Sequence, residues 1–254
     1  DWPRFLSANP NRGDLIVSGL AYLLTAPGVP IIYYGLEQGF NGNCPSTLHA
    51  GSANPSIAQT CQQSSGSDSL KRQDMFVSGP WRLNSAIQEI DSLSYVGPVK
   101  PALSPQWRED PMLNTNISVY QVARKLSALR GSCSALAGGA MVWKYASDSN
   151  GGVMVFSRVT DTEEMLIMVN PGGAGSATAS TFPIDSKINT VSGQKYANVF
   201  DSSQIAFTGF DQNHQATLYL PKNFRVSGGS MAIFARVDNL LPVDKLLSIQ
   251  LCKR

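Results

Sequence analysis

The sequence predicts a chain of two parts, an α/β part followed by an all-β part. Near its start a helical pattern, a short turn and a continuous apolar run follow one another. After residues 138–139, short runs of β character alternate with pieces rich in glycine, asparagine and serine. This change of texture predicts a domain boundary near residues 132–140. We expect the first domain at residues 1–135, the second at 139–240 and a tail at 241–254.

The predicted helix–turn–strand unit lies at residues 14–34. Asp14 can cap a helix that runs to Ala26, because apolar residues recur on one face of this segment. Pro27-Gly28 ends the helix. The run 29–34 then combines β-branched and aromatic residues between two glycines, which is typical of a parallel strand covered on both faces. A helix, a short turn and a buried strand form the repeating unit of α/β folds.

A second helical pattern covers residues 116–129, and the part after it predicts a series of short strands. Repeated short strands separated by turn residues indicate a β-sandwich or a β-barrel. The predicted strands are residues 141–145, 153–159, 165–169, 197–200, 204–207, 216–220 and 231–237.

Composition and charge exclude several classes of protein. The formal net charge of +2 is spread along the chain without a run of Lys or Arg, which argues against nucleic acid and membrane surfaces as partners. The longest apolar stretch, residues 28–35, is too short to span a bilayer. The sequence contains no H-E-x-x-H, G-x-S-x-G or Walker motif. The glycine-rich residues 171–175 lie between predicted strands, where a hairpin or loop explains them better than phosphate binding.

The cysteines favour an exported protein. None of the four has C-x-x-C or another metal-binding spacing. Cys44 and Cys61 bracket a polar loop, which predicts a disulfide rather than two free thiols. The pairing of Cys133 and Cys252 is left open. Asn116 begins a glycosylation sequon, and together with the low charge these features predict a secreted, extracellular protein.

Two motifs flank the first helix and carry a family resemblance. Residues 1–5 read D-W-P-R-F, and residues 25–39 read T-A-P-G-V-P-I-I-Y-Y-G-L-E-Q-G. This order resembles the seventh and eighth β/α units of the α-amylase family of glycoside hydrolases. Residues 66–83 look like the corresponding segment of fungal, particularly basidiomycete, α-amylases. The resemblance is specific over residues 1–135 and mostly architectural beyond. It implies the C-terminal end of a (β/α)8 TIM barrel followed by an antiparallel Greek-key β-sandwich domain.

The resemblance also implies roles for three residues. Asp1 resembles the third catalytic carboxylate of the family, a transition-state stabiliser; the alternative is a surface aspartate. On the same alignment Asp68 and Arg72 hold sugar hydroxyls, although they could also pair with each other at the surface. Glu37 is either a residue at the edge of the cleft or a solvated carboxylate. Asp1 and Glu37 both fall at ends of barrel strands, where the active sites of such barrels lie.

Four further residues are expected to have mainly structural roles. Arg4 fits an ion pair at the barrel rim better than a substrate contact. Tyr33 and Tyr34 fit packing better than sugar stacking. Trp81 could stack on a sugar ring, but packing in a core explains it equally well.

The function implied is that of a partial α-amylase whose parent hydrolyses internal α-1,4-glucosidic bonds of starch or maltooligosaccharides with retention, as a monomer. The nucleophile, the acid/base glutamate and the calcium ligands of the family belong to units that precede Asp1. We therefore expect calcium in the parent enzyme, with no ligands in this chain, and no hydrolysis by the chain alone. Two alternatives remain. One is a relative that transglycosylates or cleaves from chain ends, and the other is a non-catalytic carbohydrate-binding or structural module.

Overall fold

A computed structural model describes residues 5, 15–38, 118–147, 152–172, 176–177 and 180–253. The chain divides into two compact units. One unit contains Val17–Pro30 and Ala123–Arg254 and holds every described strand. The described residues 15–16, 31–38 and 118–122 fall in the other unit.

Both predicted long helices are confirmed. Helix α2 covers Leu15–Thr25 and helix α7 covers Ser118–Ser132. A short helix that the sequence did not predict, α8, covers Ser134–Gly138. Each long helix buries an apolar face, which is what holds helices of this length in place. Within the described residues, no helix is long and apolar enough to cross a membrane. The fully or nearly fully buried residues of these faces are Ile16, Leu20, Ala21, Leu24, Val119, Ala123, Leu126 and Leu129.

The predicted strand at residues 29–34 is wrong. These residues pair with no described strand, and Tyr34 already lies in a turn that precedes the 3-10 helix η1 (Leu36–Gln38). Val29 is 88% exposed and Ile31 is 80% exposed. A parallel strand is stable only between hydrogen-bonded neighbours and under covering layers. No described residue supplies either to this run, so its apolar pattern is present without the strand.

All seven predicted strands of the all-β part are confirmed, with shifted ends. Three very short strands had not been predicted. The strands are β1 (Ala140–Ala146), β2 (Met154–Val159), β3 (Glu164–Asn170), β4 (Ser176–Ala177), β5 (Thr181–Pro183), β6 (Lys195–Asn198), β7 (Asp201–Phe210), β8 (Ala216–Tyr219), β9 (Arg225–Val226) and β10 (Ser230–Arg236), followed by the 3-10 helix η4 (Val237–Asn239).

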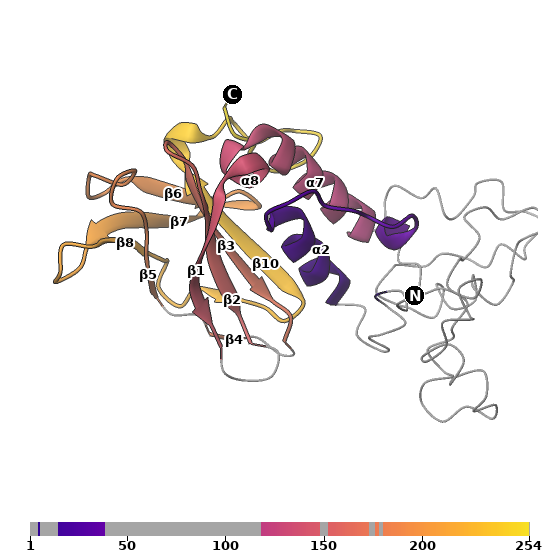
Figure 1. Ribbon diagram of the computed structural model, residues 1–254, viewed down its shortest axis with the longest axis horizontal. Coiled ribbons are helices and arrows are strands. Elements are labelled where there is room, and N and C mark those ends of the chain that lie inside the picture. The colour runs from indigo at the N-terminus through magenta and orange to yellow at the C-terminus, as the bar shows by residue number, and fades with distance from the viewer. Residues whose placement is uncertain are drawn as a thin grey trace, which may run out of the picture. The chain divides into compact units, whose positions relative to one another are not determined.

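Eight of these strands form one antiparallel sheet in the order β1-β2-β3-β10-β6-β7-β8-β5, and β4 pairs with β9 (Figure 1). The segment β10-β6-β7-β8 has the spatial order of a Greek key, since three consecutive strands are followed by one that returns beside the first. The two edge strands approach each other, with the rings of Tyr145 in β1 and Phe182 in β5 6.5 Å apart. The sheet is therefore rolled until it is nearly closed, which leaves little free edge.

A β-bulge in β1 helps to close this roll. The register with β2 shifts between Trp143 and Tyr145, so Lys144 is the extra residue. The side chains of Lys144 and Tyr145 consequently both reach residues of the inner face: Lys144 pairs with Glu164, and Tyr145 packs on Phe182. Trp143 packs on the opposite face, against Phe156.

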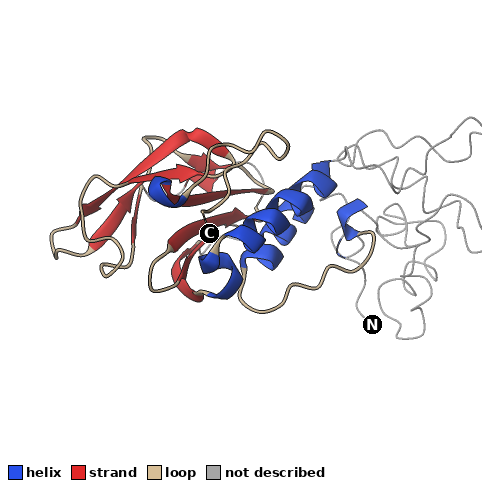
Figure 2. Cartoon of the chain, turned by 90° about the horizontal axis from the view of Figure 1, so that it is seen from above, coloured by secondary structure: helices blue, strands red, loops and turns tan. Residues whose placement is uncertain are grey.

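The part of the sheet around β3 is covered on both faces. Leu166 and Met168 of β3 belong to the core inside the roll, whereas Met165 and Ile167 alternate to the other face, and all four are fully buried. On this other face, helix α8 contacts β2 and β3, and the ring of Tyr22 in α2 lies 6.1 Å from that of Phe156 in β2. Figure 2 shows helices along this side of the sheet.

Candidate functional site

The three predicted site residues, Asp1, Asp68 and Arg72, lie outside the described residues. Their roles in catalysis and sugar binding therefore stay predictions. The same holds for the Cys44–Cys61 disulfide and for the roles of Arg4 and Trp81.

The structure describes residues 25–38 of the second motif, and the segment Y-Y-G-L-E at residues 33–37 forms its turn. Gly35 has a φ of 82°, a conformation that favours glycine, and the backbone N–H of Leu36 donates to the carbonyl of Tyr33 at 3.1 Å. The turn places Glu37 in η1, where it is partly exposed. The rings of Tyr33 and Tyr34 lie 4.7 Å apart, and Tyr33 is 48% exposed. Gly35 thus permits the tight turn that leads into η1, the 3-10 helix that contains Glu37.

Two arginines hold the end of helix α2. Arg158 in β2 donates to the carbonyl of Thr25, and its Nη2 also donates to the carbonyl of Gly139 at 2.7 Å. Arg130 in α7 donates to the carbonyls of Leu24 and Ala26 at 2.8 and 2.9 Å, and to that of Gly28. The last carbonyls of a helix lack partners within the helix and carry partial negative charge, so cations are favourable there.

Arg158 is the less expected of the two, because it is only 1% exposed. Burial lowers the pKa of both guanidiniums, and the charge of Arg130 lowers the pKa of Arg158 further. The carbonyl oxygens of α2 compensate for this burial by accepting the hydrogen bonds. The two arginines therefore fix the place where the chain leaves α2 and enters the T-x-P-G motif. Strand periodicity alone gave no sign of this role.

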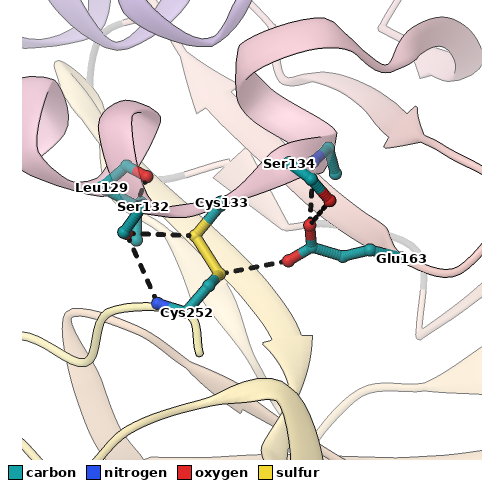
Figure 3. The surroundings of a disulfide bond; sticks show 7 residues. Leu129, Ser132, Cys133, Ser134, Glu163 and Cys252 are labelled. Carbon is teal, nitrogen blue, oxygen red and sulfur yellow. Dashed lines mark hydrogen bonds between the residues drawn. A yellow bond between two sulfur atoms is a disulfide. The ribbon is translucent and has the colours of Figure 1, made fainter. Parts of the chain in front are cut away.

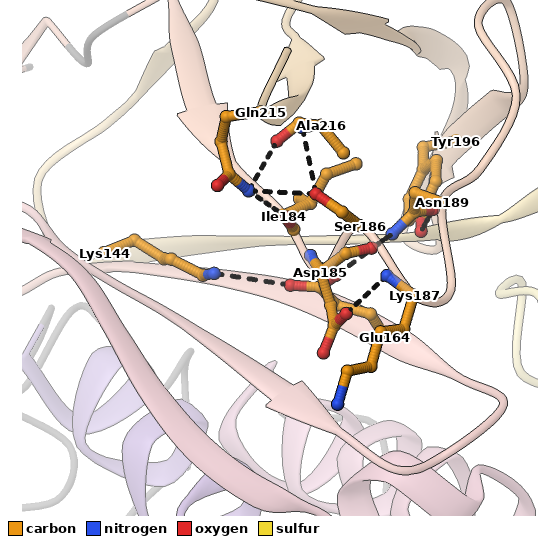
Figure 4. A network of polar contacts seen from close by, with 10 residues as sticks. All are labelled: Lys144, Glu164, Ile184, Asp185, Ser186, Lys187, Asn189, Tyr196, Gln215 and Ala216. Carbon is orange, nitrogen blue, oxygen red and sulfur yellow. Dashed lines mark hydrogen bonds and ion pairs between the residues drawn. The ribbon is translucent and has the colours of Figure 1, made fainter. Parts of the chain in front are cut away.

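A buried polar network lies at the start of β3, around Glu164 (Figure 4). The Glu164 side chain is fully buried, and its Oε1 lies 3.6 Å from Nζ of Lys144 in β1. Its Oε2 accepts hydrogen bonds from the backbone N–H of Asp185 at 2.7 Å and from the amide of Asn189 at 3.1 Å. The hydroxyl of Tyr196 donates to Oδ1 of Asn189 at 2.7 Å. The network ties the loop after β5 to strands β1, β3 and β6.

This network serves structure rather than chemistry on a substrate, since its carboxylate has no exposed surface. Burial raises the pKa of the Tyr196 phenol well above its ordinary value, and the charge of Glu164 raises it further. Removing one member of such a pair leaves the other charge buried and unpaired, which is strongly destabilising.

A disulfide joins Cys133, between α7 and α8, to Cys252 near the end of the chain (Figure 3). Beside it, Oε2 of Glu163 accepts hydrogen bonds from the hydroxyl of Ser134 at 2.6 Å and from the backbone N–H of Ala135 at 2.8 Å. Glu163 thus satisfies donors at the start of α8, a favourable place for a carboxylate. The pairing that the sequence left open is therefore defined.

The same cluster does not suit calcium. Cys133, Glu163 and Cys252 form the only group of potential metal ligands within the described ranges. Both sulfurs are joined in the disulfide, which leaves one carboxylate, whereas calcium takes 6–8 oxygen ligands. Calcium in the parent enzyme thus stays a prediction about residues upstream of this chain.

Neither a protein-family model nor the sequence of a curated protein matches the chain. Its fold is similar to those of glycoside hydrolases of the α-amylase family. One is a cyclomaltodextrin glucanotransferase with a three-domain ABC distribution, at 19% identity and a TM-score of 0.53, with 92% of this chain and 34% of that chain covered. Another is the γ-cyclodextrin-type glucanotransferase of alkalophilic Bacillus clarkii, at 20% identity and a TM-score of 0.52, with 93% and 25% covered.

The α-amylase of Geobacillus thermoleovorans, solved with acarbose, is similar at 17% identity and a TM-score of 0.51, with 92% of this chain and 36% of that chain covered. This chain thus spans between a quarter and about a third of the length of these enzymes. At such identities the similarity concerns the fold alone.

Proposed function

We propose that this chain is the C-terminal part of a secreted, fungal-type α-amylase that hydrolyses internal α-1,4-glucosidic bonds of starch with retention. In that enzyme it supplies a third catalytic carboxylate, Asp1, and part of the substrate cleft through Asp68 and Arg72. The nucleophile, the acid/base glutamate and the calcium ligands come from barrel units upstream of Asp1. Residues 1–254 alone accordingly hydrolyse no starch.

The observation that carries the proposal is the order of motifs around α2. D-x-P-R-F precedes this helix and T-x-P-G-x-P-x-I-Y-Y-G-x-E-x-G follows it. The helix itself forms at Leu15–Thr25 and ends on the first residue of the second motif. An antiparallel β domain comes after them, and the fold is similar to those of α-amylase family enzymes.

The three residues have different chemical tasks in this proposal. Retaining hydrolysis needs one carboxylate as nucleophile and one carboxylic acid as proton donor. A third carboxylate at Asp1 accepts hydrogen bonds from sugar hydroxyls, and these bonds strengthen as the anomeric carbon becomes cationic. Such an interaction lowers the barrier more than it improves substrate binding. Asp68 and Arg72 bind hydroxyls of the glucan in both the ground state and the transition state.

The test is made in the enzyme that joins this chain to its upstream barrel units. Asp1→Asn should lower kcat on soluble starch by about 10²–10³-fold or more, because a preorganised charge aimed at the transition state is lost. KM should change much less. Reducing-sugar release measures both. Asp74→Asn makes the same chemical change two residues beyond Arg72 in sequence and should leave kcat within about twofold. A near-normal kcat for Asp1→Asn would reduce Asp1 to a surface residue and remove the catalytic assignment.

Arg72→Ala should give the opposite pattern. The loss of a contact made in both states raises KM and changes kcat only modestly. Lys71→Ala, which removes the neighbouring cation, is the control for a general charge effect. If both variants raise KM equally, Arg72 has no specific place in the cleft.

A second candidate function is transglycosylation, since cyclomaltodextrin glucanotransferases are among the structures with a similar fold. Chromatography of the products from soluble starch distinguishes the two. Linear maltooligosaccharides from the first minutes of reaction support endo-hydrolysis, and cyclic products support transglycosylation. If the upstream units lack the aspartate and glutamate of the family, the chain is part of a non-catalytic carbohydrate-binding protein instead.

A further inference from the structure

One oxygen of Glu163 lies against the Cys133–Cys252 disulfide without a structural reason. The other oxygen, Oε2, accepts hydrogen bonds at the start of α8. Oε1 instead lies 3.1 Å from Sγ of Cys252 (Figure 3). A sulfur in a disulfide carries no hydrogen, so this contact becomes a hydrogen bond only in the reduced protein. No N–H or O–H of the described residues donates to Oε1, although Glu163 is only 6% exposed.

Reduction changes what these three side chains offer to a ligand. A dithiol reductant gives two electrons and two protons to the disulfide, so the sulfur–sulfur bond breaks, two thiols form, and the reductant closes its own disulfide. The two sulfurs and a carboxylate oxygen of Glu163 already lie within 4.8 Å of one another. The reduced protein therefore gathers two thiols and one carboxylate at a single point.

These three groups come from distant parts of the sequence, and the fold brings them together. Cys133 precedes α8, Glu163 precedes β3, and Cys252 forms an isolated bridge with Leu240. Two thiolates on one tetrahedral metal lie roughly 3.8 Å apart, since each metal–sulfur bond measures about 2.3 Å. Neither cysteine belongs to a strand of the sheet. Rotation of both side chains therefore separates the sulfurs without breaking the pairing of any described strand.

A cavity beside the disulfide gives access to this point. It has a volume of about 580 Å³ and is lined by Ser132 and Cys252, together with apolar residues of α7 and of the last part of the chain. A metal site needs an entry path for the ion as well as ligands at suitable distances. The same cavity admits a water molecule, which supplies a fourth ligand beside the two sulfurs and the carboxylate.

The kinds of ligand decide the metal. Thiolates are soft ligands that select zinc over calcium and magnesium, and zinc also accepts a carboxylate oxygen. We propose that Cys133, Cys252 and Glu163 form a zinc site in the reduced protein, which the disulfide replaces on oxidation. Binding of the ion displaces the two thiol protons into solvent. The inference concerns the β domain and does not depend on the proposed catalytic function.

The test uses the full 254-residue chain with Cys44→Ser and Cys61→Ser, so that Cys133 and Cys252 are its only cysteines. The chain is reduced with a dithiol, freed of the reductant without oxygen, and dialysed against Zn²⁺. Elemental analysis should find about one zinc ion per reduced chain and no comparable binding by the oxidised chain. Co²⁺ in place of Zn²⁺ should give the charge-transfer absorption of a thiolate-bound metal. Circular dichroism checks that the reduced chain is folded.

Glu163→Gln separates a metal ligand from a helix cap, because glutamine keeps an oxygen that can accept from Ser134 and Ala135. It should weaken zinc binding by about tenfold or more, since even residues that only support metal ligands contribute about 10–100-fold. Asp161→Asn, at an exposed position two residues away, makes the same type of change and should leave the zinc Kd unaltered.

Cys252→Ser keeps the test decisive if Glu163→Gln fails to fold, and it should abolish zinc binding by the reduced chain. Absence of zinc from the reduced, folded chain would overturn the inference. Equal binding by the oxidised chain, by Glu163→Gln or by Cys252→Ser would overturn it as well, because the ion would then be held by other residues.

Discussion

Strand β3 and residues 29–34 are both apolar in sequence, but only β3 forms a buried strand. Both are short apolar runs, and a strand is predicted from each. All seven residues of β3 are buried, whereas Val29 and Ile31 are largely exposed and unpaired among the described residues. β3 has β2 on one side and β10 on the other, a core against one face and helix α8 against the second.

The difference shows what an apolar run encodes. The apolar composition of such a run predicts that the segment is buried. Burial also requires neighbouring strands and covering elements, which come from elsewhere in the chain. β10 lies more than 55 residues beyond β3 in sequence and still pairs with it over six residue pairs. Residues 29–34 are equally apolar but pair with no strand in the described part of the chain. Three experiments test features that β3 has and residues 29–34 lack. These are paired strands on both sides, a helical layer over the outer face of the sheet, and a network of hydrogen-bonded polar groups at the start of the strand.

The largest effect should come from matched substitutions in the two runs. Ile167 in β3 lies between Phe156 of β2 and Ile233 of β10 and is fully buried. Ile167→Ala should lower the free energy of unfolding by about 2–5 kcal/mol, because it leaves a cavity. Ile31→Ala, the same change at an exposed site, should cost less than about 0.5 kcal/mol. Urea unfolding followed by circular dichroism measures both. Equal costs at the two sites would mean that residues 29–34 are buried in solution.

A substitution at Arg158, which joins α2 to the sheet, should lower the free energy of unfolding by a smaller amount. Arg158→Met keeps the length of the side chain but leaves the carbonyls of Thr25 and Gly139 without their donor. We expect a loss of about 1–3 kcal/mol in the free energy of unfolding. Arg225→Met, at an exposed position of β9, should be nearly neutral. If Arg158→Met stabilises the protein, the desolvation of this guanidinium outweighs its hydrogen bonds.

The smallest effect concerns the polar end of β3 and depends on pH. The unfolded chain loses the tyrosine proton near pH 10, but burial beside Glu164 raises the pKa of Tyr196 in the folded state. Above about pH 10 the folded state therefore binds more protons than the unfolded state, so stability falls as pH rises, by up to about 1.4 kcal/mol per pH unit. This contribution is fully present below pH 10.

Tyr196→Phe should remove that alkaline slope, apart from a constant loss for the hydrogen bond to Asn189. Tyr219→Phe, at an exposed residue of β8, should leave the slope unchanged. Urea unfolding of the three proteins at pH values from 9 to 11 tests this. Identical slopes for all three would show that another group controls the alkaline stability.

The elements that sequence predicted correctly are those with strong local patterns. Helices α2 and α7 and the seven longer strands show periodic or β-branched runs bounded by turn residues. Strand β5, with three residues, and helix α8, with five, are too short to produce a pattern. The run 29–34 was mispredicted because pairing depends on residues far away in sequence.

The polar contacts that organise the molecule gave little local signal. A charged residue such as Arg158 is expected to face solvent, yet it is buried under the end of α2. Glu164 in β3 and Lys144 in β1 belong to strands that are separated by β2 in the sheet, so no local pattern predicts their pairing. Asp1, Asp68 and Arg72 were predicted from motifs of a family, and their test is chemical.

The Cys133–Cys252 disulfide has a mechanical consequence. Every described strand lies between these two cysteines, which are 119 residues apart in sequence. The β domain is therefore a covalent ring, and a single cut of its backbone leaves one molecule rather than two. Tension applied along the chain from either side passes through the sulfur–sulfur bond and bypasses the hydrogen bonds of the sheet. The sheet bears such a load only after the disulfide is reduced.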